Sequence, residues 1–112
     1  MKRVYVCGSF KFVDKIEELE RLLRRGNVEF IVSKGLNARG ILGCLEKVDQ
    51  ADIVYVVNPY GYVGKSVSID IGYAYARSKP IYAMQAIDDP PIMDLVRGVL
   101  TFDELITLAK KK

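Results

Sequence analysis

The sequence predicts an α/β domain with three layers, in which helices cover both faces of a doubly wound parallel sheet. Five short runs of β-branched and aromatic residues alternate with segments whose apolar residues repeat at helical spacing. The run at 53–57 is apolar throughout, as is typical of strands covered on both faces. The connections are short, and right-handed crossovers place helices on each face in turn.

The first strand and helix come from the opening 27 residues. Residues 3–7 form a nearly continuous β-branched and aromatic run, which predicts a strand. Residues 12–25 are expected to form a helix, and Gly26 with Asn27 is typical of its end. The apolar residues at helical spacing there are Val13, Ile16, Leu19, Leu22 and Leu23.

The middle of the chain repeats this alternation. Residues 28–32 read as a strand and 33–35 as a loop, and a helical stripe runs from Asn37 to about Gln50. Glycines within that stripe weaken it. The apolar run 53–57 is the predicted centre of the sheet.

The last part of the chain, from residue 66 onward, is expected to form two further strands and three helices. The expected elements are a helix at 66–78, a strand at 80–84, a short helix at 91–97, a strand at 99–101 and a helix at 102–110. The predicted strand order is 2-1-3-4-5, the flavodoxin-like variant of the Rossmann-like folds, within one domain over 1–112. In that order the loops after Cys7 and Val57 meet at one crevice.

Composition and charge argue against several classes of function. The 112 residues carry a net charge of +3, and its excess lies mainly at a helix end and in the lysine tail, so we expect no nucleic-acid binding. Apolar runs are only strand-length and no secretory segment is visible, which predicts a cytoplasmic protein without a membrane partner. Cys7 and Cys44 are expected to be reduced. The absence of histidine argues against a zinc site and His-dependent nucleophiles.

A polar loop joins the central strand to the next helix. Its segment Gly61-Tyr-Val-Gly64-Lys65-Ser66 resembles part of a phosphate loop, but Pro59 stands where such a loop needs glycine. A weaker interpretation is that the start of the helix binds a single phosphate or carboxylate. The alternative is that Ser66 merely caps the helix and the glycines merely turn the chain.

Asp70 lies in a helix of otherwise apolar or small residues. A carboxylate near a helix start is favoured by the helix dipole, which alone could account for it. The helix is expected to be mostly buried, however, and a buried carboxylate needs a further reason. The residues alone therefore leave two interpretations of Asp70, an acid stabilised by the helix dipole and a functional group.

Three segments resemble the nucleoside 2-deoxyribosyltransferase family and the related 2'-deoxynucleoside 5'-phosphate N-hydrolases. They are the strand that ends in Gly8-Ser9, the Ala51-Asp52 pair before the central strand, and the stretch 68–76 followed by Lys79-Pro80. The resemblance implies a flavodoxin-like fold, a dimer, no metal or organic cofactor, and cleavage of the bond between a deoxyribose and its base. It places a glutamate nucleophile at the position of Asp70 and a second acid at that of Cys44.

The resemblance also assigns the pocket. The candidate substrate-binding residues are Gly8, Ser9, Phe10, Arg39, Asn58, Gly64 and Ser66. The expected function is cleavage or transfer of the N-glycosidic bond of a (deoxy)nucleoside or nucleoside 5'-monophosphate, with Asp70 as nucleophile. A non-catalytic nucleotide-binding module is the alternative, because Asp70 and Cys44 depart from the family's acids. A purely structural role is a third, since a fold does not determine an activity.

Overall fold

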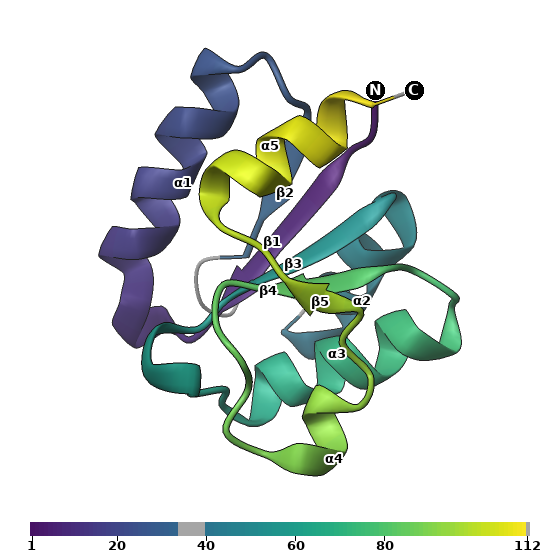
Figure 1. The fold of residues 1–112 in the computed structure, drawn as a ribbon. Coiled ribbons are helices and arrows are strands. Elements are labelled where there is room, and N and C mark those ends of the chain that lie inside the picture. The colour runs from purple at the N-terminus through teal and green to yellow at the C-terminus, as the bar shows by residue number, and fades with distance from the viewer. Residues whose placement is uncertain (34–39, 112) are drawn as a thin grey trace.

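The structure, a computed structural model, describes residues 1–33 and 40–111. Five strands alternate with helices along the chain (Figure 1). The strands are β1 (Val4–Gly8), β2 (Phe30–Val32), β3 (Ile53–Val57), β4 (Ile81–Ala83) and β5 (Gly98–Val99). The helices are α1 (Val13–Arg25), α2 (Ile41–Gln50), α3 (Lys65–Ala76), α4 (Pro90–Met93) and α5 (Phe102–Lys110), with short 3-10 helices η1 (Phe10–Phe12) and η2 (Pro59–Gly61).

The sheet is parallel and its strand order is β2-β1-β3-β4-β5, which confirms the predicted fold class. β1 pairs along its whole length with β3, from Val4 opposite Ile53 to Gly8 opposite Val57. The carboxyl ends of the two central strands therefore lie at the same level. The crevice predicted between the loops after these strands follows from this register.

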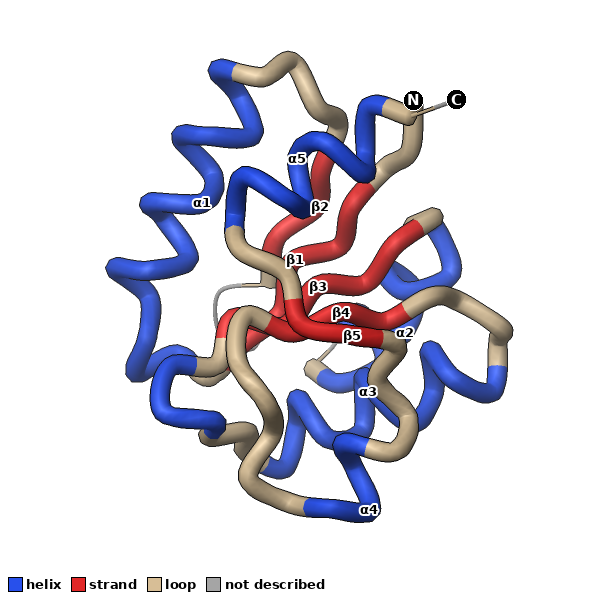
Figure 2. Tube along the Cα trace, viewed as in Figure 1, coloured by secondary structure: helices blue, strands red, loops and turns tan. Residues whose placement is uncertain are grey.

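Helices cover both faces of the sheet (Figure 2). One face packs against α1 and α5 through a core that contains Val4, Val6 and Tyr55. The opposite face packs against α2, α3 and α4 and carries Tyr5 and Cys7. Successive residues of β1 thus alternate between two cores, as the period of a strand requires. Tyr5 and Cys7 face the layer that contains α3.

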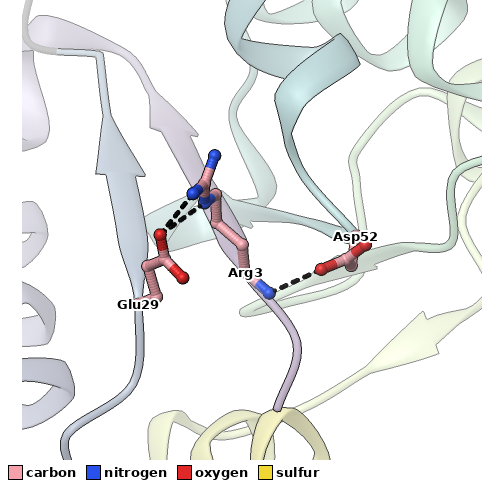
Figure 3. Close-up of polar contacts among 3 residues, drawn as sticks. All are labelled: Arg3, Glu29 and Asp52. Carbon is pink, nitrogen blue, oxygen red and sulfur yellow. Dashed lines mark hydrogen bonds and ion pairs between the residues drawn. The ribbon is translucent and has the colours of Figure 1, made fainter.

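Polar contacts connect the segments that lead into β1, β2 and β3, at the amino-terminal edge of the sheet (Figure 3). The backbone N–H of Arg3 donates to Asp52 Oδ2 at 2.8 Å, and Arg3 Nε donates to Glu29 Oε1 at 2.9 Å. A second guanidinium nitrogen of Arg3 also contacts Glu29. Asp52 therefore has a structural role before the central strand, at the edge of the sheet that faces away from the crevice.

Most predicted elements match the structure, and the differences lie at their ends. The helix predicted over 91–97 is wrong beyond Met93. Leu95 N–H bonds the carbonyl of Ile92 and Val96 N–H that of Met93, so tight turns replace the helix, and Arg97 N–H joins the sheet at Ile81. The helix predicted over 37–50 is described from Ile41 onward, since residues 34–39 lie outside the described part of the chain.

No helix within residues 1–33 and 40–111 has the length and apolar character needed to span a bilayer.

Candidate functional site

A cavity of about 440 Å³ opens at the carboxyl end of β1, between the loop after that strand and the start of α3. Its volume lies within the range of small-molecule sites. The lining residues are Cys7, Gly8, Ser9, Phe10, Ser33, Cys44, Tyr62, Gly64, Lys65, Ser66, Val67 and Asp70. They come from β1 and its loop, the end of β2, α2, the loop after β3 and α3, so the cavity lies at the predicted crevice.

The loop between β3 and α3 is held against the loop after β4. The side-chain amide of Asn58 donates to the carbonyl of Gln85 at 2.8 Å, and its oxygen accepts from Gln85 N–H at 3.0 Å. Gly61 has a φ of +77°, and a Cβ added there would lie 2.7 Å from the carbonyl oxygen of Ala86. This close contact and left-handed conformation require glycine. The loop therefore has little freedom where it enters the cavity.

Asp70 lies on the buried face of α3, with only 3% of its surface exposed. The hydroxyl of Tyr5, from β1, donates to Asp70 Oδ2 at 3.1 Å. The other oxygen, Oδ1, is buried and has no hydrogen-bond partner among the described residues. An unsatisfied buried carboxylate oxygen is costly, so its presence at a cavity wall calls for an explanation, and a catalytic role is one that such groups have.

Burial raises the pKa of Asp70 from 3.8 to about 6. The hydrogen bond from Tyr5 and the positive charge of Lys47 act in the opposite direction, because both stabilise the carboxylate. Burial also raises the pKa of Tyr5 and that of the Cys7 thiol, so both remain protonated at neutral pH. A carboxyl group that titrates near neutrality beside a cavity is a typical feature of an active site.

The N-terminus of α3 borders the same cavity. Gly64 is the N-cap residue, and no side chain among the described residues caps this helix. The first intrahelical bond joins Ser68 N–H to the carbonyl of Gly64, so the amides of residues 65–67 precede the hydrogen-bonded ladder. Their partial positive charge and the ammonium of Lys65 favour an anion in this part of the cavity.

Aromatic contacts connect the two loops at the rim. The ammonium of Lys11 lies 3.8 Å from the centre of the Tyr62 ring, and the ring of Phe12 meets Tyr62 edge-on at 6.0 Å. Phe10 remains 62% exposed beside them. The rim therefore offers ring faces to a planar group, next to a cation.

Six of the candidate residues line the cavity together: Gly8, Ser9, Phe10, Gly64, Ser66 and Asp70. Ser9 also caps η1, where its hydroxyl accepts from Lys11 N–H at 3.4 Å. Ser66 lies inside the first turn of α3 and does not cap it, so the capping interpretation is wrong. Asn58 is fully buried, is bonded to Gln85, and is not among the lining residues. Arg39 lies outside the described residues.

Sequence reasoning did not select Tyr5 and Ser33, which contribute to the site. Ser33 carried a usable signal, because it is the first polar residue after β2 and lies at the same edge of the sheet as Gly8. Tyr5 carried none: in a continuous apolar strand it is indistinguishable from a core residue. Its role depends on contact with a residue 65 positions away.

Comparison with known proteins supports the fold only. No protein-family model matches the chain, and no curated protein matches it. Among solved structures, a 2-deoxyribosyltransferase from Bacillus psychrosaccharolyticus superposes with a TM-score of 0.71 at 14% identity, over 98% of this chain and 92% of that one. A CMP N-glycosidase from Clostridium botulinum superposes with a TM-score of 0.63 at 18% identity, over 96% and 97%.

The same fold also occurs in proteins that are described by other functions. The sugar isomerase domain of an RpiR transcription factor from Sphaerobacter thermophilus superposes with a TM-score of 0.66 at 18% identity, over 88% of this chain and 54% of that one. Similarity at these identities establishes a shared architecture. The function must therefore be argued from the site.

Proposed function

We propose that this chain cleaves or transfers the N-glycosidic bond of a (deoxy)nucleoside or nucleoside 5'-monophosphate, with the carboxylate of Asp70 as nucleophile. The observation that carries the proposal is the state of that carboxylate. It is buried at a cavity wall, with Oδ2 bound by Tyr5 and Oδ1 unpaired among the described residues. The shared fold with a 2-deoxyribosyltransferase and a CMP N-glycosidase is compatible with this chemistry.

In the proposed reaction, Asp70 Oδ1 forms a bond to the anomeric carbon while the bond from that carbon to the base nitrogen breaks. The base leaves with the bonding electron pair and takes up a proton from the solvent. Water or a second base then attacks the anomeric carbon, loses a proton to the solvent, and displaces the Asp70 carboxylate as the bond between that carbon and Oδ1 breaks. Tyr5 holds Oδ2 throughout, which leaves the charge of the nucleophile on the free oxygen.

The rest of the cavity suits the remainder of the substrate. The open start of α3, with Ser66 and Lys65, is suited to a 5'-phosphate or 5'-hydroxyl. The exposed ring of Phe10 and the ring of Tyr62 provide stacking surfaces for a base. No metal or organic cofactor is part of the proposed reaction.

The proposal is tested by incubating the protein with deoxynucleosides and deoxynucleoside 5'-monophosphates and measuring free base by chromatography. Asp70→Ala should abolish release, because it removes the nucleophile. Asp70→Glu should retain it, because the longer side chain still presents a carboxylate. Wild-type release should increase with pH through about 6 as Asp70 ionises.

The matched control is Asp103→Asn, which removes an exposed carboxylate on α5, across the sheet from the cavity. This variant should release base at the wild-type rate. The proposal fails if the wild type releases no base from any of these compounds, or if Asp70→Ala releases as much base as the wild type.

A non-catalytic nucleotide-binding module is the second candidate. It is favoured by Cys44, which lies in the cavity where the resemblance places an acid, and by Asp70, which is one methylene shorter than glutamate. Misplacement of a reacting group by about 1 Å can reduce a rate about a hundredfold. In this case a nucleotide would raise the melting temperature without base release.

The homodimer that the resemblance implies is also a proposal. Sedimentation equilibrium should give twice the chain mass of 12.6 kDa. A mass equal to that of one chain at micromolar concentration would exclude it.

A further inference from the structure

The lining of the cavity contains a single carboxylic acid. Within the part of the chain that the structure describes, Asp70 is the only aspartate, glutamate or histidine that lines it. Residues 34–39 and 112, outside that part, include none of these residue types, and the whole sequence has no histidine. The other polar groups of the lining are thiols, hydroxyls and one ammonium, which are much weaker acids than a carboxyl group.

This composition affects how the base can leave the sugar. A neutral purine or pyrimidine is a good leaving group only when it receives a proton, which a second acid supplies in general acid catalysis. Asp70 cannot supply that proton, because in the proposed reaction it attacks as a carboxylate. The hydroxyl of Tyr5 is also in use, since it donates to Asp70 Oδ2 at 3.1 Å. The cavity is therefore poorly suited to a neutral base.

We propose that the substrate is a nucleotide whose base is a quaternised heterocycle, which carries a positive charge before the reaction begins. Pyridinium and N7-alkylated purine nucleotides are examples of this chemical class. The proposal rests on the proposed function and narrows the substrate class of the same site. A base of this class leaves as a neutral molecule, so the reaction needs no acid.

The charges balance in this reaction. Asp70 Oδ1 forms a bond to the anomeric carbon while the bond from that carbon to the base nitrogen breaks, and the bonding electron pair neutralises the base. The carboxylate loses its negative charge in the same step. Water then attacks the anomeric carbon, loses a proton to the solvent, and displaces the Asp70 carboxylate. Neutralisation of two opposite charges is favourable in a buried site, where isolated charges are costly.

The charges around the cavity also suit a cationic base. Asp70 Oδ1 has no hydrogen-bond partner among the described residues, so its negative charge is available to a cation. Phe10 lines the cavity and is 62% exposed, and the face of an aromatic ring attracts a positive charge. The ammonium of Lys11 already lies 3.8 Å from the centre of the Tyr62 ring. We therefore expect the charged base beside Phe10.

The test compares 2'-deoxyguanosine 5'-monophosphate with its N7-methyl derivative, which differs by one methyl group and one positive charge. Free base is measured by chromatography at a pH of about 6, where Asp70 is partly ionised, and each catalysed rate is divided by the uncatalysed rate of the same compound. A general acid contributes about 10²–10⁴-fold to a rate. The rate enhancement should therefore be at least about a hundredfold greater for the N7-methyl compound.

Cys44 offers a matched pair of variants, because it lines the same cavity as Asp70 and is only 3% exposed. Cys44→Asp adds a second carboxyl group, and two carboxyl groups in one buried cavity are expected to retain a proton. This variant should raise release from the unmethylated compound at least about tenfold relative to the N7-methyl compound. Cys44→Asn has the same shape without the acid and should keep the wild-type ratio. The ratio is independent of the fraction of protein that is folded.

The proposal is overturned if the enhancement for the N7-methyl compound is less than about a hundredfold greater, or if Cys44→Asn narrows the difference by the same factor as Cys44→Asp. Where Cys44→Asp does not fold or leaves the ratio unchanged, the wild-type comparison decides alone. Equal enhancement of both compounds that is lost in Asp70→Ala would reject this proposal and uphold the proposed function. If no compound releases base, or if release persists in Asp70→Ala, the proposed function fails as well.

Discussion

Asp70 lowers the stability of the folded protein once it is ionised. Raising its pKa from 3.8 to about 6 corresponds to about 3 kcal/mol of unfolding free energy. The sign follows from proton binding, since the folded state holds this proton at a pH where the unfolded state has released it. The penalty is absent below pH 3.8, develops as the pH rises toward 6, and is complete above that value.

Asp70→Asn therefore tests the residue without any substrate. The variant keeps the shape of the side chain and loses the buried charge. We expect its free energy of unfolding to exceed that of the wild type by about 2 kcal/mol at pH 7.5 and to equal it near pH 4. Urea unfolding at the two pH values measures the difference, and equal stabilities at both would contradict it.

Asn58 shows how a polar residue at the end of a strand can serve the fold instead of a ligand. Both polar groups of its side chain are used on the backbone of Gln85, and the residue is fully buried. Its position after β3 is the position of a ligand-binding residue in this topology. The pairing with Gln85 assigns it instead to holding the loop.

At the scale of elements, α3 and α5 begin differently. α5 has a complete capping box, in which the Thr101 hydroxyl accepts from Glu104 N–H and the Glu104 carboxylate accepts from Thr101 N–H. α3 begins at Gly64 without a side-chain cap among the described residues. The cavity borders the uncapped end, where an anionic ligand would supply what a cap supplies elsewhere.

This difference is tested at Lys65, the first residue of α3. Lys65→Ala removes the ammonium, and Lys65→Pro removes the ammonium and the backbone N–H together. Proline is tolerated at this position, and the extended conformation of Gly64 suits a residue that precedes proline. We expect Lys65→Pro to bind a deoxynucleoside 5'-monophosphate about tenfold more weakly than Lys65→Ala.

Isothermal titration calorimetry measures both affinities. Far-UV circular dichroism checks that the helix content of the two variants is the same. Equal affinities would show that the amide of Lys65 takes no part in binding.

At the scale of the whole molecule, the site depends on how closely the two central strands approach each other. A Cβ added at Gly8 would lie 2.7 Å from the carbonyl oxygen of Val57 and 3.3 Å from Ile16. The carbonyl belongs to the backbone of the neighbouring strand and cannot rotate away. Glycine at this position thus lets β1 and β3 stay paired up to the cavity.

Gly8→Ala should therefore destabilise the protein by about 1–3 kcal/mol, because the two strands must separate. The matched control is Gly72→Ala in α3, where an added Cβ would meet nothing within 4 Å. That variant should stabilise the protein by about 0.5–1 kcal/mol, since alanine favours a helix. Thermal and urea unfolding measure both, and a neutral Gly8→Ala would contradict the interpretation of the register.

The N-terminal segment contacts α5, the last helix of the chain. The N–H of Lys2 donates to the carbonyl of Ala109 at 2.9 Å, so the start of the chain lies beside the last turn of α5 (Figure 1). α5 thereby covers the sheet on the face opposite α3, together with α1. The cavity lies at the carboxyl edge of the sheet. There the loop after β1 leads to α1 on one face, and the loop after β3 leads to α3 on the other.

The sequence by itself determined the fold class, the order of elements and the crevice. These follow from apolar periodicity, strand composition and short connections, which are local properties. Together with the family resemblance it also selected Asp70 and most of the loop residues that line the cavity, because strand ends of a known order lie at one edge of the sheet. Errors in boundaries, such as the helix beyond Met93, arose where tight turns and sheet pairing outweighed local preference.

Only the tertiary structure decided which groups surround Asp70. Tyr5 is 65 positions from Asp70 and Ser33 is 11 from Cys44, and no local pattern in the sequence indicates either contact. Their meeting depends on the packing of α2 and α3 against the sheet at the level of Tyr5. Burial in that layer, which no residue's identity encodes alone, also sets the pKa of Asp70.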